Sequence, residues 1–267
     1  MSQQNWNDEM WDTIQMTDGT NRLNRLKRAL NQGADVKKLS NGGTSPLAYL
    51  MTEEHSVNDM VRSIVKSGAK TKNTAEEIII FNLYIKYYFQ RPTLLKYLLF
   101  HRVFESLTIY DFTNALHEIA AICQENSLGV MQVCIGHMIK VRMDVRQVIS
   151  HKDHNGDSII HNVVNGTGAD RRPAMIQQLI RWGANVLQQD IKGDTPEQCA
   201  KNDGLCPQVL MPGQHYLITI LEEKRHNIEE IARERRQAFS MAWHERLGRD
   251  SNVNGIDPDL IDIIWNA

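Results

Sequence analysis

Residues 179–200 read LIRWGANVLQQDIKGDTPEQCA, and residues 29–50, ALNQGADVKKLSNGGTSPLAYL, follow the same plan. In each stretch an apolar run ends at a glycine, and a hydroxyl residue followed by proline comes later. Gly183 precedes Pro196 by thirteen residues, and Gly33 precedes Pro46 by the same thirteen. Equal spacing between matched residue types indicates that one structural unit occurs at least twice in this chain.

The glycine is typical of the end of one helix, and the hydroxyl residue followed by proline is typical of the start of the next. Glycine favours the left-handed backbone that ends many helices, and Gly68 also follows an apolar run. A hydroxyl side chain accepts a hydrogen bond from an unpaired amide at a helix start, where proline loses nothing by lacking an N–H. Apolar residues recur at helical spacing between such starts and ends, as in Val57, Met60, Val61 and Ile64. Such short, one-sided helices must bury their apolar stripe against neighbouring hairpins.

These stretches resemble the ankyrin repeat, in which a glycine ends one helix, a β-turn finger follows, and a T-P-L-H-x-A-like sequence begins the next helix pair. Ser45-Pro46-Leu47, Thr195-Pro196 and Ser158-Ile159-Ile160-His161 occupy that position here. The resemblance extends over about residues 20–200 and is weakest within residues 74–150. It implies an all-α, ankyrin-type solenoid of helix-turn-helix hairpins, with short β-turn fingers and a helical C-terminal cap.

The repeat pattern also predicts how the chain is organised. We expect an ankyrin-repeat array over residues 1–225, with about five repeats and a partial sixth that begins at Thr195, followed by a helical cap or tail over 226–267. Residues 78–89 and 93–100 are expected to form one divergent helix pair. Asn114-Ala115-Leu116-His117 resembles a divergent T-P-L-H motif, which predicts a helix start at these residues. The distance from Leu116 to Ile160 exceeds one repeat, so an insertion is expected within residues 140–152.

Residues 151–164, HKDHNGDSIIHNVV, contain three histidines and two aspartates within eleven positions. In the repeat interpretation Asp153 and Gly156 shape the finger, Ser158 begins a helix, and His161 bonds neighbouring backbone. The alternative is a metal-dependent enzyme that uses the finger at 151–161. A zinc site needs three or four converging ligands, which two histidines on a turn do not favour. The spacing does not fit an EF-hand loop, and the usual nucleotide, serine-hydrolase and zinc-protease motifs do not occur. We therefore expect no catalytic residue, metal or cofactor.

Composition and charge limit the partners. A net charge of −2 provides no bulk field for nucleic acid, and acids dilute the basic run at 232–239, so nucleic-acid binding is not expected. The sequence contains no uninterrupted apolar stretch of membrane-spanning length and begins without the features of a signal peptide. The expected location is the cytoplasm, with the nucleus as an alternative, where the four cysteines stay reduced. We expect a monomer.

The C-terminal segment Ile256-Asp257-Pro258-Asp259-Leu260-Ile261 is similar to the opening helix of an F-box. An alternative function is therefore a substrate receptor or adaptor that recruits a ubiquitin-ligase component through its tail. The simpler interpretation is that the apolar residues of the tail pack as core.

The ankyrin resemblance implies a non-enzymatic scaffold that binds a partner protein through the concave face made by the fingertips and first helices. A rigid stack loses little entropy when a partner docks on it. A pocket holding perturbed titratable groups in hydrogen-bond reach of one another would favour an enzyme instead. The candidate contact residues, chosen by their position in the repeat, are Lys38, Leu39, Ser40, Asn41 and Tyr49 near the first finger, His151, Lys152 and His154 in the long finger, and Gln188, Gln189 and Lys192 in the last.

Overall fold

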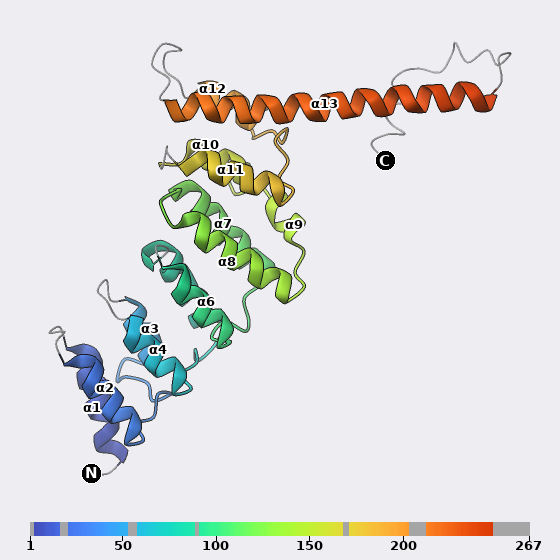
Figure 1. Ribbon diagram of the computed structural model, residues 1–267. Helices are drawn as coiled ribbons and strands as arrows, with labels where there is room; N and C mark the ends of the chain where they lie inside the picture. Colours follow the sequence, from blue (N-terminus) through green and yellow to red (C-terminus); the bar gives the residue numbers. More distant parts are fainter. Residues whose placement is uncertain are drawn as a thin grey trace. The chain divides into compact units, whose positions relative to one another are not determined.

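The computed structural model describes residues 3–16, 21–52, 58–88, 91–167, 171–202 and 212–247. Within these ranges the chain is helical, and an isolated β-bridge joins Lys152 to Ser158. The helices, shown in Figure 1, are α1 (Gln3–Gln15), α2 (Arg22–Asn31), α3 (Pro46–Thr52), α4 (Asn58–Lys66), α5 (Thr74–Leu83), the π-helix η1 (Tyr84–Tyr88), α6 (Pro92–Phe100), α7 (Ile109–Ile122), α8 (Ser127–Lys140), α9 (Val145–Ser150), α10 (Ile159–Asn165), α11 (Arg172–Arg181), α12 (Pro196–Asn202) and α13 (Pro212–Leu247).

The helices up to α12 form successive pairs that stack side by side (Figure 1). First helices contact first helices, in the order α1, α3, α5 with η1, α7, α10 and α12. Second helices α2, α4, α6 and α8 contact one another in the same order. One continuous core runs through the stack, so each apolar stripe is covered by the next pair. This arrangement confirms the predicted all-α repeat solenoid.

The chain divides into two compact units, Met1–Leu221 and Glu222–Ala267, and the boundary falls within α13. In the second unit, ion pairs join Arg225 to Glu229 and Arg233 to Glu230 along the helix. Residues 248–267, which include the F-box-like segment, lie outside the described residues. The functional division into array and tail stays a prediction.

The three glycines predicted to end helices, Gly33, Gly68 and Gly183, adopt the left-handed backbone that the sequence predicts. At Gly183 φ is 97°, and the N–H of the following Ala184 donates to the Leu179 carbonyl at 3.0 Å. This bond closes the helix end by the Schellman pattern. Gly33 and Gly68 have the same conformation and the same bonds.

In the divergent middle, arginines occupy the same left-handed position. Arg102 follows α6 with φ of 54°, and Arg142 follows α8 with φ of 62°. The next residue again donates to the helix, from Val103 to Leu98 at 3.1 Å and from Met143 to Met138 at 2.9 Å. The turn is therefore retained although a side chain there costs about 1–2 kcal/mol relative to glycine.

Three connections form the same β-turn finger, at residues 40–44, 153–157 and 190–194. In each finger the first residue's N–H donates to the carbonyl of the fifth, and a glycine N–H donates to the carbonyl of the first. The side chain of the first residue accepts from the fifth residue's N–H, which fixes the turn: Ser40, Asp153 and Asp190 do this at 3.1, 3.0 and 2.9 Å. The predicted roles of Asp153 and Gly156 are confirmed.

The middle connections depart from this plan. Residues 69–73 and 103–108 are short and form no finger, and α5 and α7 begin correspondingly early. The helix start predicted at Asn114 is wrong, because a capping box between Thr108 and Asp111 begins α7 at Ile109. The expected insertion within 140–152 is present as α9, which buries Val148 and Ile149.

Buried polar side chains of four first helices bond the backbone of the connection that leads into the next pair. Such a group costs free energy unless it is paired, so each one fixes the position of the next connection. The contacts are Asn7 Oδ1 with the Asp35 N–H (2.6 Å), Glu77 Oε2 with the Ser106 N–H (2.7 Å), His117 Nε2 with the His151 carbonyl (3.2 Å) and His161 Nε2 with the Asp194 carbonyl (3.0 Å).

We predict that Arg102→Gly and Arg142→Gly each stabilise the chain by about 0.5–1 kcal/mol, because glycine removes left-handed strain and this gain exceeds the added freedom of the unfolded chain. The measurement is the midpoint of urea unfolding followed by circular dichroism.

Gly183→Ala is the matched control, since a Cβ at Gly183 meets no atom within 4 Å and only the backbone conformation opposes it. This variant should lose about 1 kcal/mol. Lower midpoints for both arginine variants would contradict the strain argument.

Candidate functional site: a polar groove on the first helices

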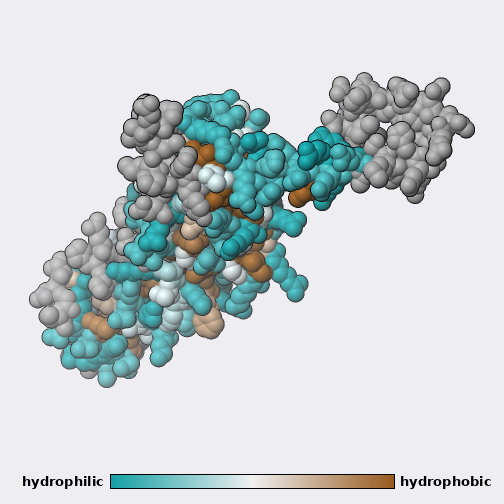
Figure 2. Space-filling view, turned by 45° about the horizontal axis from the view of Figure 1, so that its top comes forward, coloured by the Kyte–Doolittle hydropathy of each residue, from teal (hydrophilic) through white to brown (hydrophobic). Residues whose placement is uncertain are grey.

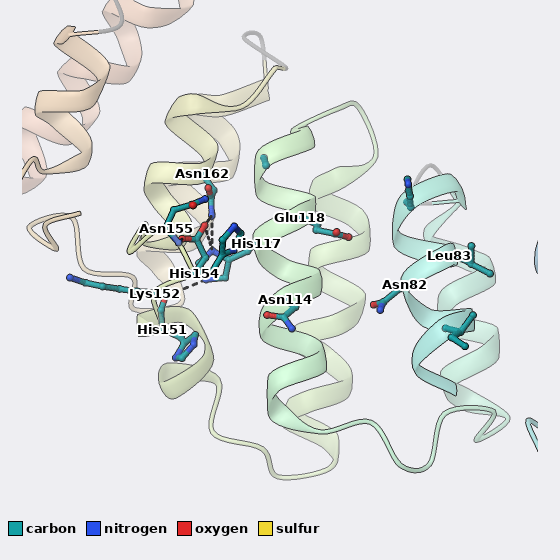
Figure 3. Close-up of a pocket in the computed structure, with 14 residues that line it drawn as sticks. Asn82, Leu83, Asn114, His117, Glu118, His151, Lys152, His154, Asn155 and Asn162 are labelled. Carbon is teal, nitrogen blue, oxygen red and sulfur yellow. Dashed lines mark hydrogen bonds and ion pairs between the residues drawn. The ribbon is translucent and has the colours of Figure 1, made fainter. Parts of the chain in front are cut away.

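A groove of about 1060 Å³ lies on the first-helix side of the array, between α5 with η1, α7, and the finger that precedes α10. Figure 3 shows Asn114 and Glu118 extending from α7 into it, and Asn82 facing them from the neighbouring helix. His154 and Asn155 come from the finger. Three successive repeats therefore contribute to one surface.

A polar network fixes one wall of the groove. Asn162 Nδ2 lies 2.7 Å from His117 Nδ1 and 2.9 Å from Asp153 Oδ2. Asp153 Oδ1 accepts from the N–H groups of Asn155 and Asp157. Because the His151 carbonyl can only accept, Nε2 of His117 carries the proton, and Nδ1 accepts from Asn162. The network joins α7, α10 and the finger.

The network matches the neutral form of His117 and the ionised form of Asp153. Burial lowers the pKa of His117 below its ordinary value and outweighs the opposing attraction of Asp153. For Asp153, burial alone would raise the pKa. The hydrogen bonds from Asn162 and from the Asp157 and Asn155 backbone, with the nearby His117, bring it below its usual range.

The His117–Asp153 pair satisfies part of the test for an enzyme, because perturbed titratable groups share a groove. Both ring nitrogens of His117 are nevertheless engaged by the protein itself, and its side chain is only 7% exposed. A general base needs a nitrogen within reach of a substrate proton. This geometry therefore favours a positioning role for His117 over catalysis.

The metal hypothesis for the finger is also disfavoured by geometry. His161 is fully buried, with Nδ1 at 2.8 Å from Ser158 Oγ and Nε2 at 3.0 Å from the Asp194 carbonyl. It has no nitrogen left to join His151 and His154 as a ligand. The predicted role of His161 as a repeat histidine is confirmed.

A different trio brings possible ligand atoms together in the last finger. Atoms of Asp190, Asp194 and Cys199 lie within 4.8 Å of one another. Asp190 Oδ1 already accepts from the N–H groups of Lys192 and Asp194. The finger turn that Asp190 stabilises explains why these three residues lie close together.

The buried cysteines are core thiols. Cys123 and Cys134 are fully buried, and burial raises the pKa of Cys123 to about 11 and that of Cys134 to about 12. A nucleophilic cysteine needs the opposite shift. Cys199 is half-buried, and Cys206 lies outside the described residues.

The structure places the candidate contact residues in three groups. His151, Lys152 and His154 line the groove. In Figure 3 the Lys152 side chain extends away from His117. Gln188 donates to the Ser150 carbonyl at 2.9 Å, which ties the last finger to the end of α9. Gln189 and Lys192 are exposed.

The first group lies at the N-terminal repeats. Lys38, Leu39 and Asn41 are exposed, and Ser40 is half-buried as part of its finger. Trp11 contacts two members of the group: its indole N–H donates to the Lys38 carbonyl at 3.1 Å, and its ring packs edge-on against Tyr49 at 6.0 Å between centroids.

The helical side of the groove, on α5, η1 and α7, was not predicted from the sequence. Its signal is a run of exposed residues at helical spacing, Asn114, Glu118 and Ala121, on the opposite face of α7 from the buried Leu116 and Ile119. The early start of α7 brings this face beside the finger.

No family model matches this sequence, and no curated protein matches it either. Among solved structures, the crystal structure of EF0377, an ankyrin repeat protein, is similar with a TM-score of 0.54. The identity is 14%, and the match covers 81% of this chain and 97% of that chain. The fold is therefore that of an ankyrin-repeat solenoid. None of the helices that the structure describes is long and apolar enough to cross a membrane.

We predict that the chain loses stability as the pH falls below about 6.5, the ordinary histidine pKa. Below that pH, His117 binds a proton in the unfolded chain but stays neutral in the folded chain, where its pKa is lower. Protonation therefore favours the unfolded state. In His117→Gln the slope of unfolding free energy against pH between about 7 and 5.5 should fall by up to about 1.4 kcal/mol per pH unit.

The pKa of His137 is also lowered, by burial and by Lys140. His137 is present in both proteins, so its contribution to the pH slope cancels in the comparison. Urea titrations at each pH give the slope. Equal slopes in wild type and variant would contradict the assignment of His117.

Proposed function

We propose that this chain is a non-enzymatic binding module that holds a partner protein against the polar groove of its first helices. One observation carries the proposal. The groove is lined by exposed side chains from three repeats, while the finger that closes it is fixed by His117, Asn162 and Asp153. A surface ordered before binding loses little entropy when a partner docks.

The chemistry of the lining supports a protein partner of mixed character. Glu118 contributes a negative charge, Lys86 and Lys152 contribute positive ones, and Ile79 is an apolar side chain that is 56% exposed. Protein interfaces combine apolar anchors with polar rims in this way. A nucleic acid would need a dense basic surface, which this groove does not provide.

The contacts proposed for the groove are His151, Lys152 and His154 together with Asn82, Asn114 and Glu118. The first and last fingers extend the proposed surface to the neighbouring repeats. We propose further that the chain acts as a monomer in the cytoplasm or nucleus. An adaptor role of the tail concerns residues outside the described ranges and stays a separate hypothesis.

We predict that the double variant Asn114→Arg with Glu118→Arg loses the partner, because two bulky cations enter the groove without disturbing the core. Both residues are exposed. Affinity purification of the full chain followed by quantitative mass spectrometry should show at least one protein reduced by about tenfold or more, which corresponds to about 1.4 kcal/mol.

The matched control is Lys66→Glu, an exposed change on the second helix α4, which should retain the same protein. Circular dichroism confirms that each variant folds. The proposal is wrong if every protein captured by wild type is captured equally by the double variant.

A further inference from the structure

A second groove, of about 410 Å³, lies between two second helices, α6 and α8, away from the residues of the polar groove. Its apolar side chains are Leu99, Phe100 and Val133. Phe100 is 69% exposed, and among the large apolar residues described only Ile191, at 76%, is more exposed. An apolar groove on an outer helix face indicates an interaction surface when neighbouring features identify its occupant.

The groove is open because one face of α8 carries glycines. Gly129, Gln132, Val133, Gly136 and Lys140 recur at helical spacing and all line the groove. A Cβ built on Gly136 meets no atom within 4 Å, whereas one on Gly129 would touch Pro92 at 3.4 Å. Glycine in a helix interior costs about 1 kcal/mol relative to alanine, and core packing does not require it at Gly136.

The charged side chains that line the groove are Lys96 and Lys140, and no acidic residue is among its lining. Residues 91–102 and 127–143, which form α6, α8 and the turns after them, contain no aspartate or glutamate. They carry Arg91, Lys96, Arg102, Lys140 and Arg142 in a chain whose net charge is −2. This local concentration of positive charge is the feature that identifies the occupant.

Basic and apolar groups are in direct contact at the rim. Lys140 Nζ lies 5.7 Å from the centroid of the Phe100 ring, within the range of a cation–π interaction. Lys96, one turn before Phe100 on α6, is exposed at the same groove. An occupant would therefore meet an apolar floor with ammonium groups beside it.

We propose that this groove docks an acidic, amphipathic peptide segment of a partner protein. The apolar side chains of the segment would replace water over Phe100 and Val133, as in helix-in-groove recognition. Its carboxylates would lie beside Lys96 and Lys140, where opposite charge raises the association rate and selects the partner. The surface is separate from the polar groove, so the two proposals can fail independently.

Selection of a random peptide library, of about 16-residue peptides, on the immobilised full-length chain tests the proposal. We expect a recovered class that combines several acidic residues with large apolar ones. A labelled peptide of this class should bind in fluorescence anisotropy, with an affinity that falls as salt is added.

Two variants locate the binding. Gly136→Leu places a side chain in the open groove, and Lys96→Glu with Lys140→Glu reverses its charge; each should weaken binding by about tenfold or more. Gly136→Ala is the matched control, because its methyl group leaves most of the groove open and favours the helix. Asn114→Arg with Glu118→Arg should bind the peptide as wild type does.

The proposal is overturned if no acidic, apolar class is recovered, or if such peptides bind Gly136→Leu and the charge-reversed variant as tightly as wild type. It is also overturned if sedimentation of the wild-type chain alone shows a dimer that Gly136→Leu abolishes, since a second copy would then occupy the groove. Unfolding midpoints of both variants verify that they are folded.

Discussion

The array depends on polar side chains that reach from one helix pair to the backbone that introduces the next. Apolar burial draws the pairs together but is not directional, so it would tolerate many relative positions. The buried Asn7, Glu77, His117 and His161 each bond the backbone of the following connection. A buried polar group left unpaired costs about 1–3 kcal/mol, which selects one register between neighbours. The same contact at His117 also shapes the groove, so stability and the proposed binding surface share residues.

Much of this fold could be predicted because the terminal repeats keep residues with a single physical use. Gly33 and Gly183 end helices, Pro46 and Pro196 begin them, and the equal spacing within these pairs showed that one unit recurs. The middle was harder to predict, since Arg102 and Arg142 occupy left-handed turns that arginine disfavours. Packing of the residue that follows, such as the buried Val103, outweighs the preference of the turn residue itself. In the divergent repeats, the sequence signal that still indicates a helix end is the apolar residue that follows the turn.

The candidate site could be predicted only in part. The finger at 153–157 could be predicted because its turn residues act locally, and position in the repeat placed His154 in it and His151 just before it. The helical wall was not visible, because it depends on where α7 begins. The Thr108–Asp111 capping box sets that start five residues before Asn114. Figure 2 shows mainly hydrophilic side chains on one face of the molecule, with apolar residues in small separate groups.

The inserted helix α9 shows how such an array can diversify. Lengthening one connection by a few residues costs only a few tenths of a kcal/mol in loop-closure entropy, and Val148 and Ile149 offset that cost by packing against α7 and α8. The helix pairs on either side need not change their spacing. The length of a single connection can therefore change without redesign of the stack that supports it.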